Sequence, residues 1–307
     1  MLTILSIIII FIIILIIIGN YFINKLFIKN NKPLFKKKET NKEETENKKL
    51  IKEKRKIWFE SNQNDIYTIS NDNLKLHANM IMNDSNVYVI IVHPYEGRGS
   101  YMKYFAQKFY NIGFNVLCID LRSHGDSEGK VYSLGYLERL DIIAWIDYIN
   151  KNYKNTKIIL YGISMGANAI MMSSCEDISN NVKVIIEDSG FTTAKEQLQR
   201  KLDILKYLPF LPIIQIISLM LKIRKVGFSI YDIDIIKSIS KSKIPILFIH
   251  GDKDSLVDFS MLDKLYNACG SEKEKLIIEG GEHISAVFQN EYLYWNTVEN
   301  FINKYID

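Results

Sequence analysis

The pentapeptide Gly162-Ile163-Ser164-Met165-Gly166 follows the apolar run Lys157–Tyr161 and decides the fold. A serine between two glycines at the end of a strand is typical of a sharp strand-to-helix turn that exposes the serine hydroxyl. The serine backbone is strained in such a turn, and glycine at both flanking positions removes the Cβ atoms that would collide there. A turn of small residues without chemistry is the alternative, because the pattern also arises by chance. The rest of the chain has to decide between the two.

The composition is that of a chain with one large domain. The 307 residues are 48% hydrophobic and carry a formal net charge of +4. This length suffices for an α/β domain with a substantial core. Cys118, Cys175 and Cys269 are odd in number and widely spaced, so they form neither a disulfide framework nor a zinc pattern. We therefore expect no metal and no other cofactor.

The first 23 residues are expected to form a transmembrane anchor. Met1–Ile23 contains no charged side chain, and Leu2–Ile18 is almost unbroken Ile, Leu and Phe. At about 1.5 Å per residue, a helix of this length covers a hydrocarbon core of about 30 Å. A cleaved signal peptide is the alternative, but it would have a basic n-region, a shorter apolar stretch and an A-x-A-like cleavage site. The sequence therefore favours an uncleaved anchor.

Residues 24–56 are expected to form a basic juxtamembrane linker. From Lys25 to Lys56 there are 13 Lys and Arg against 5 Glu, a net +8 that leaves −4 for the rest of the chain. The basic balance is thus local and does not indicate nucleic-acid binding. It fits either contact with anionic lipid headgroups or a solvated spacer. Because positive charge follows the anchor, the positive-inside rule favours the cytoplasmic side for the downstream domain.

Residues 57–307 have the pattern of one α/β domain. Two alternating runs joined by Asn71-Asp72-Asn73 predict a hairpin, and the later, more continuously apolar runs predict strands that are buried on both faces. Helical stretches alternate with these runs, so we expect an eight-stranded, mostly parallel sheet with helices on both faces. The expected strands are Asp65–Ile69, Leu74–Met80, Val87–Val92, Asn115–Ile119, Lys157–Tyr161, Val182–Ile186, Ile244–Ile249 and Lys275–Ile278, and the expected helices include Tyr101–Tyr110, Tyr136–Asn150, Phe259–Ala268 and Glu291–Tyr305.

Polar residues and glycines gather where these strands end. His93–Gly99, Asp120–Gly129, His250–Asp254 and Glu279–His283 each follow an expected strand directly, as Ser164 does. Ligands of open parallel sheets bind at the carboxyl ends of the strands. We therefore expect the chemistry of this chain at that edge.

With these strand ends, the region from about Asp65 to Tyr305 resembles the α/β-hydrolase fold. It looks like the serine-hydrolase branch that contains acylglycerol lipases, serine aminopeptidase-like proteins and membrane-anchored bacterial hydrolases. The shared motifs, in the order of the family, are D-L-R-S-H-G-x-S-E-G from Asp120, G-I-S-M-G from Gly162 and H-G-x-x-D from His250. One departure is Pro94, where the family usually has glycine after the first-loop histidine.

The resemblance implies a serine hydrolase that cleaves carboxylic esters, possibly acylglycerols, through an acyl-enzyme. Its partner would be a small-molecule acyl substrate. A peptidase, amidase or thioesterase with the same triad is the alternative, and a non-catalytic membrane-anchored binding protein on the same fold is a further one. The fold by itself does not specify the substrate.

A catalytic triad is expected from Ser164, Asp254 and His283. A serine hydroxyl needs a general base, and the family order is nucleophile, acid, histidine. Of the five histidines, His283 alone lies beyond the acid candidates near Asp254, which is the last residue of H-G-x-x-D. Asp188, Asp252 and Asp258 remain as rival acids, foremost Asp188. The other histidines are His77, expected to be structural, His93 and His250, expected to shape loops, and His124, nearest to a pocket wall.

Two backbone N–H groups are expected to stabilise an oxyanion. One belongs to Met165, directly after the nucleophile at the start of a helix. The family's second donor corresponds to Tyr95, because Pro94 has no N–H.

Residues 194–243 are expected to form a small helical cap. The segment is too long for a plain crossover and contains the apolar stretch Tyr207–Leu221. A second membrane span is disfavoured, because Lys206 and Lys222 bracket this stretch and two prolines interrupt it. An apolar cap suits an acyl chain, although the same residues could serve only to pack the cap on the domain.

Overall fold

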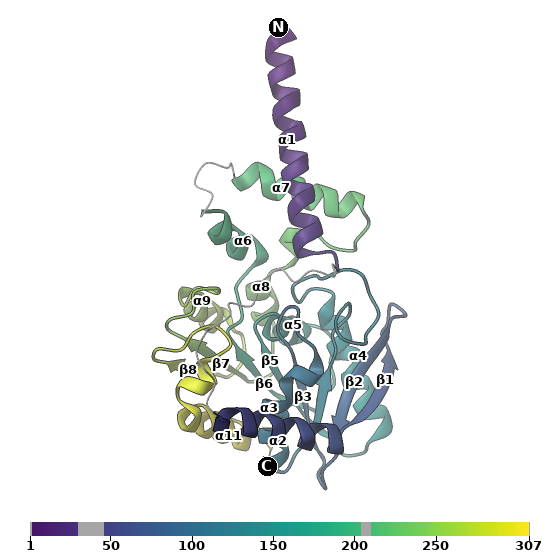
Figure 1. The fold of residues 1–307 in the computed structure, drawn as a ribbon, viewed down its shortest axis with the longest axis vertical. Helices are drawn as coiled ribbons and strands as arrows, with labels where there is room; N and C mark the ends of the chain where they lie inside the picture. The colour runs from purple at the N-terminus through teal and green to yellow at the C-terminus, as the bar shows by residue number, and fades with distance from the viewer. Residues whose placement is uncertain (1, 30–45, 204–209, 307) are drawn as a thin grey trace.

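A computed structural model describes residues 2–29, 46–203 and 210–306. Within them, eight strands form one sheet in the order β1-β2-β4-β3-β5-β6-β7-β8 (Figure 1). The β1–β2 and β2–β4 pairs are antiparallel, and the other neighbours are parallel. The expected eight-stranded, mostly parallel sheet is therefore confirmed. The strands are β1 (Asn64–Ile69), β2 (Lys75–Ile81), β3 (Val87–Val92), β4 (Asn115–Ile119), β5 (Lys157–Ile163), β6 (Val182–Asp188), β7 (Ile246–Gly251) and β8 (Lys273–Ile278).

The two faces of the sheet carry separate hydrophobic cores. In β3, Ile90 and Val92 belong to one core, and Val89 and Ile91 belong to the other. Successive side chains of a strand point to opposite faces, so a strand covered on both faces has to be apolar throughout. The first face is covered by α4 (Glu138–Asn152), α5 (Met165–Ser173), α8 (Ile235–Ile239) and α9 (Ser260–Ala268), and the second by α2 (Glu46–Asn62), α3 (Lys103–Ile112) and α11 (Glu291–Ile306); shorter elements are η1 (Gly99–Met102), η2 (Ile230–Asp232) and α10 (Ala286–Gln289).

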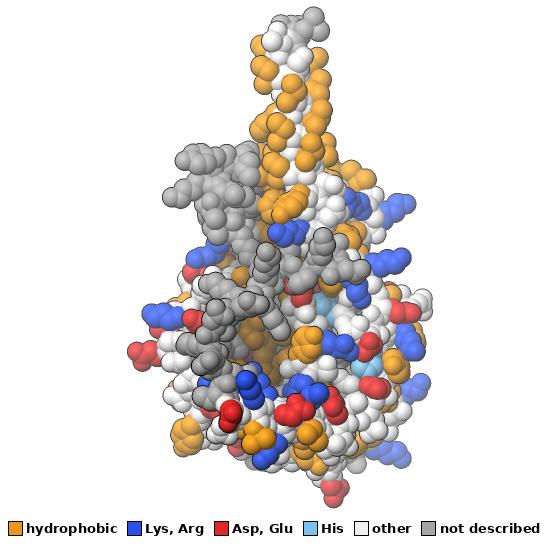
Figure 2. Space-filling model, viewed as in Figure 1, with side chains coloured by type: hydrophobic (Ala, Val, Ile, Leu, Met, Phe, Trp, Pro, Cys, Tyr) orange, Lys and Arg blue, Asp and Glu red, His pale blue; other side chains and the backbone are white. Residues whose placement is uncertain are grey.

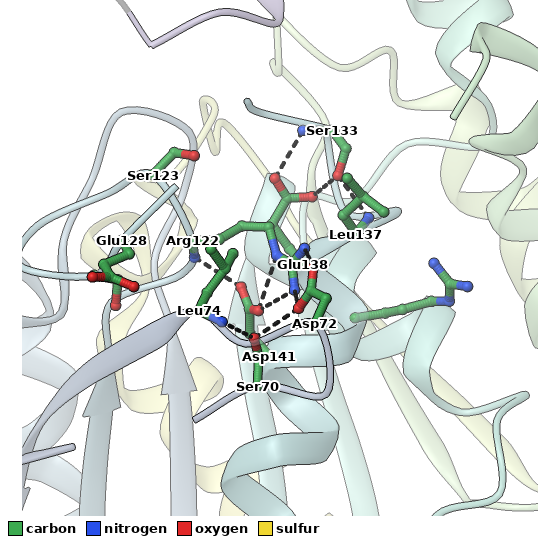
Figure 3. A network of polar contacts seen from close by, with 12 residues as sticks. Ser70, Asp72, Leu74, Arg122, Ser123, Glu128, Ser133, Leu137, Glu138 and Asp141 are labelled. Atoms are coloured by element: carbon green, nitrogen blue, oxygen red, sulfur yellow. Dashed lines mark hydrogen bonds and ion pairs between the residues drawn. The ribbon is translucent and has the colours of Figure 1, made fainter. Parts of the chain in front are cut away.

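The loop between β4 and α4 is held by an ionic network in which Arg122 and Asp141 are buried and Asp72 is exposed (Figure 3). The Arg122 guanidinium donates to Asp141 at 2.7 and 2.9 Å and to Asp72 at 2.7 and 3.1 Å. The Glu138 carboxylate accepts two backbone N–H bonds from the end of the same loop. Buried charges are tolerated when they are paired and hydrogen-bonded in this way. The network thus fixes the loop that carries Leu134 to the pocket described below.

Two helices precede the sheet. α1 (Leu2–Leu26) projects from the domain, and among the described residues it contains the one helical segment, Thr3–Leu26, that is long and apolar enough to cross a membrane. α2 begins inside the expected linker, runs across the expected domain boundary at residue 57 and packs Phe59 into the second core. Figure 1 shows α2 at the end of the domain opposite to the free end of α1.

The expected cap region contains α6 (Ala194–Asp203) and α7 (Phe210–Ile223). Residues 204–209, which include part of the expected apolar stretch, lie outside the described residues. α7 packs across α1 so closely that a Cβ at Gly19 would lie 3.1 Å from Cγ2 of Ile216. The cap therefore contacts the candidate anchor as well as the domain.

Candidate active site

Ser164 occupies a sharp turn between β5 and α5. Its backbone has φ of +55° and ψ of −115°, a conformation that a non-glycine residue rarely adopts. A Cβ at Gly162 would lie 2.5 Å from the carbonyl oxygen of Gly166, and a Cβ at Gly166 would lie 2.4 Å from that of Val92. Glycine at both positions therefore lets the turn close and lets α5 start against the end of β3.

A continuous chain of hydrogen bonds joins Ser164, His283 and Asp254. The Nε2 atom of His283 lies 2.9 Å from the Ser164 hydroxyl, and its Nδ1 atom lies 2.6 Å from a carboxylate oxygen of Asp254. An ionised carboxylate only accepts, so Nδ1 donates to Asp254 and Nε2 is left to accept from the serine. This is the arrangement that a general base needs in order to remove the serine proton.

The Asp254 carboxylate is held in its ionised form by several donors. Backbone N–H groups of Leu256 and Val257 donate to one oxygen at 2.8 and 2.9 Å. The other oxygen faces His283 and also His250, whose Nε2 lies 3.3 Å away. Burial acts to raise the pKa of Asp254, but the hydrogen bonds from His250 and His283 outweigh it, and the pKa falls well below its usual range.

His250 is a site residue that the sequence analysis assigned only to loop shaping. It is fully buried behind Asp254, and within the described residues its Nδ1 atom has no hydrogen-bond partner. Burial raises the pKa of the nearby Glu187 carboxyl to about 8, against the opposing effect of the His250 charge. The feature of the sequence that could have indicated this role is the position of His250 at a strand end, four residues before Asp254.

The rival acids have other partners. Asp188 accepts a hydrogen bond of 2.8 Å from the Tyr294 hydroxyl in the second core. Asp252 accepts a backbone N–H bond of 2.6 Å from Gly280 in the loop after β8, and Asp258 accepts one of 2.9 Å from Ser260. In the described part of the chain, none of these three carboxylates bonds to His283.

An apolar pocket opens beside Ser164, with a cavity volume of about 60 Å³. Its walls come from the end of α1, the turn at Ser164, the cap and the loops after β3, β4, β6 and β7. None of the described lining residues is charged. They are Leu26, Tyr95, Leu134, Ser164, Met165, Phe191, Gln197, Leu198, Leu256 and Val257.

The two residues expected to supply oxyanion donors both line this pocket. Met165 is the first residue of α5, where helix N–H groups point outward and the helix dipole is positive. Tyr95 lies in the loop after β3. The carbonyl oxygen of Pro94 accepts bonds from the Gly97 N–H at 2.9 Å and from Nδ1 of His93 at 2.8 Å. These two bonds fix the turn that presents Tyr95.

The expectation that His124 forms a pocket wall is wrong. His124 is buried against Tyr132 and His93, with ring centroids 4.5 and 4.8 Å away, and it stands behind Tyr95 rather than among the described lining residues. Burial and the neighbouring His93 lower the pKa of His124 to about 3, so the ring is neutral. Its motif therefore stabilises the loops around the pocket.

One cluster has the composition of a metal site. His77, Asp120 and Asp126 offer ligand atoms within 4.8 Å of one another. Their atoms are already engaged, because Nδ1 of His77 bonds to Asp120 at 2.8 Å and Asp126 forms an ion pair with Arg98 at 2.6 Å. The backbone N–H of Gly99 also donates to Asp120, at 2.6 Å. The cluster therefore ties the loops after β3 and β4 together.

Comparisons with known proteins agree with this fold. Residues 83–215 match the family model described as serine aminopeptidase, S33, a segment that contains Tyr95 and Ser164 but not Asp254 or His283. The esterase Pf2001 of Pyrococcus furiosus has a similar structure, with a TM-score of 0.65 and 24% identity over 80% of this chain and 92% of that one. A membrane phospholipase A described as a bacterial virulence factor has a TM-score of 0.60 and 14% identity over 83% of this chain and 91% of that one.

Two relatives in sequence are proteins of unassigned function. YqkD of Bacillus subtilis is 32% identical over 200 residues, which are 65% of each chain. The membrane protein YNL320W of Saccharomyces cerevisiae is 27% identical over 76% of this chain and 77% of its own. The chain thus spans slightly less than two thirds of the length of the Bacillus protein.

The chain has the α/β-hydrolase fold, with the eight-stranded, mostly parallel sheet that it shares with these solved structures. Its segment 83–215, less than half of the chain, is similar to the serine aminopeptidase S33 family.

Proposed function

We propose that this chain is a membrane-anchored serine esterase with Ser164 as nucleophile, His283 as general base and Asp254 as the acid that orients the base. The observation that carries the proposal is the pair of hydrogen bonds, 2.9 and 2.6 Å, that connects the three side chains beside an apolar pocket. Ser164 attacks the ester carbonyl carbon while its proton passes to Nε2 of His283. The protonated His283 then returns the proton to the leaving alcohol, and water later releases the acyl group by the same route.

The oxyanion of each tetrahedral intermediate is bound, in this proposal, by the backbone N–H groups of Tyr95 and Met165. Preorganised donors of this kind favour the transition state over the ground state, because the negative charge appears only during the reaction. Proline at position 94 leaves the Tyr95 N–H available and fixes the turn before it.

An ester is favoured over an aminoacyl amide by the chemistry of the pocket. A site that binds the free amino end of a peptide needs a carboxylate or a set of acceptors for the ammonium group. The described lining residues carry no such charge, and most are aliphatic or aromatic. The family match keeps a peptidase as the second candidate.

A labelling experiment and a substrate screen test the proposal together. The full-length protein in detergent should react with a fluorophosphonate probe at Ser164, and the Ser164→Ala variant should not. The wild type should hydrolyse p-nitrophenyl esters faster than aminoacyl p-nitroanilides. A folded wild type that remains unlabelled would instead favour a non-catalytic binding protein. Faster cleavage of the anilides would favour the peptidase.

We further propose that α1 spans a membrane and that the domain faces the cytoplasm. Lys25 and Lys29 follow the apolar span directly and are exposed, which agrees with positive charge on the inner side. The lysines of α2 lie at the far end of the domain, so this helix is a poor candidate for contact with anionic lipid. The basic residues near α1 are therefore the better candidates for contact with anionic lipid.

A further inference from the structure

The last residue of the candidate anchor is part of the pocket beside Ser164. Leu26 ends α1 and lines the same pocket as Leu134 and Leu198. Leu26 is more than 100 positions from the other two residues along the chain, and no local pattern near Leu26 indicates a site. α1 therefore contributes a wall to the pocket as well as a possible anchor.

The end of α1 is attached to the domain by several specific contacts. The Tyr95 hydroxyl donates to the carbonyl oxygen of Leu26 at 3.0 Å. Phe27 is fully buried against Phe228, and its carbonyl oxygen accepts the Tyr132 N–H at 2.8 Å. A short antiparallel bridge follows, in which the Lys29 N–H donates to Lys130 at 2.9 Å. A helix held in this way cannot swing freely, so its position relative to Ser164 is set.

α7 crosses α1 just above this attachment. Arg224, directly after α7, donates to the side chains of Asn20 and Asn24 on α1. Leu219 and Ile223 of α7 are 56% and 68% exposed, so this helix presents two large apolar side chains to its surroundings. Because Figure 1 shows α7 roughly perpendicular to α1, α7 would lie parallel to a membrane that α1 crosses.

The apolar surface of α1 and the basic side chains at its end indicate where the membrane surface would lie. Beyond the cap, α1 presents an almost continuous apolar surface from Ile4 to Ile17 (Figure 2). Leu2–Ile18 spans about 26 Å as a helix, close to the thickness of a hydrocarbon core. Figure 2 shows basic side chains near the foot of this helix, as lipid phosphates would require. Lys25 and Lys29 are exposed at the end of α1, and Lys222, Arg224 and Lys225 are exposed at the end of α7, where Arg224 donates to Asn20 and Asn24 of α1. Leu26 then lies about 10 Å along the helix from Gly19, within reach of the headgroup layer.

We propose that the end of α1 is a specificity-determining wall of the acyl pocket, and that the substrate is a membrane-resident amphiphilic ester, which enters from the bilayer surface beside α1 and α7. This inference rests on the proposed esterase activity. The ester C–O bond breaks, the acyl group passes to the Ser164 oxygen, and the alcohol leaves with the proton from His283. Leu26 contacts the acyl group and limits the chain length that the pocket accepts.

Substitution of Leu26 in the full-length protein tests this. Wild type, Leu26→Trp and Leu26→Ala are reconstituted in phosphatidylcholine vesicles, and kcat/KM is measured for p-nitrophenyl acetate and for p-nitrophenyl decanoate carried in the same bilayer. We expect Leu26→Trp to lower the decanoate-to-acetate ratio by at least tenfold and Leu26→Ala to raise it. Ile17→Trp, on an exposed position of the same helix, is the matched control and should leave the ratio unchanged.

The outcomes separate the inference from the proposed function. Fluorophosphonate labelling of each variant first shows that its nucleophile is intact. If the wild type is labelled and active, and both Leu26 variants have the same decanoate-to-acetate ratio as the wild type, the pocket-wall assignment is wrong and the esterase proposal stands. A wild type that is neither labelled nor active on either ester overturns both. If the decanoate is hydrolysed equally well from detergent micelles and from vesicles, entry from the bilayer is wrong.

Discussion

The hydroxyl group of Tyr95 donates a 3.0 Å hydrogen bond to the carbonyl oxygen of Leu26. Burial raises the pKa of this phenol far above its usual value, so the hydroxyl remains a donor at every physiological pH. The bond joins the last turn of the candidate anchor to the loop that carries a proposed oxyanion donor. The position of the loop that carries Tyr95 therefore depends on the position of the end of α1.

Tyr95→Phe should lower kcat by up to about fivefold while KM for a short soluble ester changes little. The variant keeps the ring and the backbone N–H but loses one hydrogen bond, which is worth about 1 kcal/mol. The oxyanion forms only in the transition state and the tetrahedral intermediate, so weaker stabilisation of it should lower kcat. Steady-state kinetics on p-nitrophenyl acetate measure both constants. An equal rise in KM with constant kcat would assign Tyr95 to substrate binding alone.

Asp254→Asn should reduce kcat by about 10³–10⁴-fold, because an amide no longer holds the productive tautomer of His283. Asp188→Asn, the matched control, removes a charge that bonds to Tyr294 instead, and should reduce kcat far less. Circular dichroism should establish that both variants are folded before rates are compared. A larger loss in Asp188→Asn would transfer the role of the acid to that residue.

Gly166→Ala should destabilise the fold by roughly 1–3 kcal/mol through a steric clash that displaces the elbow. The new Cβ would meet the carbonyl oxygen of Val92 at 2.4 Å. Gly113→Ala is a comparison with the opposite cause, because Gly113 has a φ of +109°, whereas Gly166 does not have a positive φ, and no atom lies within 4 Å of a Cβ added at Gly113. Urea denaturation gives the free energy of unfolding of each variant. A Gly166→Ala variant as stable as wild type would mean that the close approach to β3 contributes nothing.

The stability contributed by His77 should depend on pH. Burial acts to lower the pKa of His77, but hydrogen bonds to Asp120 and Asp65 outweigh it and the pKa is raised above 6.5. A raised folded-state pKa means that protonation favours the folded protein, so this contribution is complete below about pH 6.5 and is lost as pH rises through the folded pKa. Thermal unfolding of wild type and His77→Gln between pH 5 and 9 should show a gap that narrows with rising pH. A gap that widens would contradict the assignment.

Cys175 is a natural reporter of membrane sidedness. It is exposed, whereas Cys118 and Cys269 are buried. If the domain is cytoplasmic, a membrane-impermeant maleimide should label Cys175 in inverted membrane vesicles but not in intact cells. The Cys175→Ser variant controls for labelling of the buried thiols. Labelling of intact cells would place the domain on the opposite side.

Much of the fold could be predicted from local patterns. Continuous apolar runs predicted strands buried on both faces, and each overlaps a strand of the sheet, because alternate residues such as Val89 and Ile90 serve different cores. The glycines beside Ser164 predicted the elbow, because no other residue fits the close approach to Val92. The start of α2 was not predicted, because its lysine-rich first turns resemble a solvated linker and only Phe59 near its end packs on the core.

The sequence by itself determined the order of the elements, the elbow at Ser164 and a short set of candidate partners. These features follow from the hydrophobic periodicity of each segment, the steric limits of the turn at Ser164 and the order of the motifs along the chain, all of which can be read locally. Only the tertiary structure brought His283 to Asp254 rather than Asp188, set His250 behind that carboxylate and made Leu26 a wall of the pocket. His283 is 29 positions from Asp254 and Leu26 is more than 130 positions from Ser164. The topology of the sheet and the attachment of α1 therefore decide which of these side chains meet.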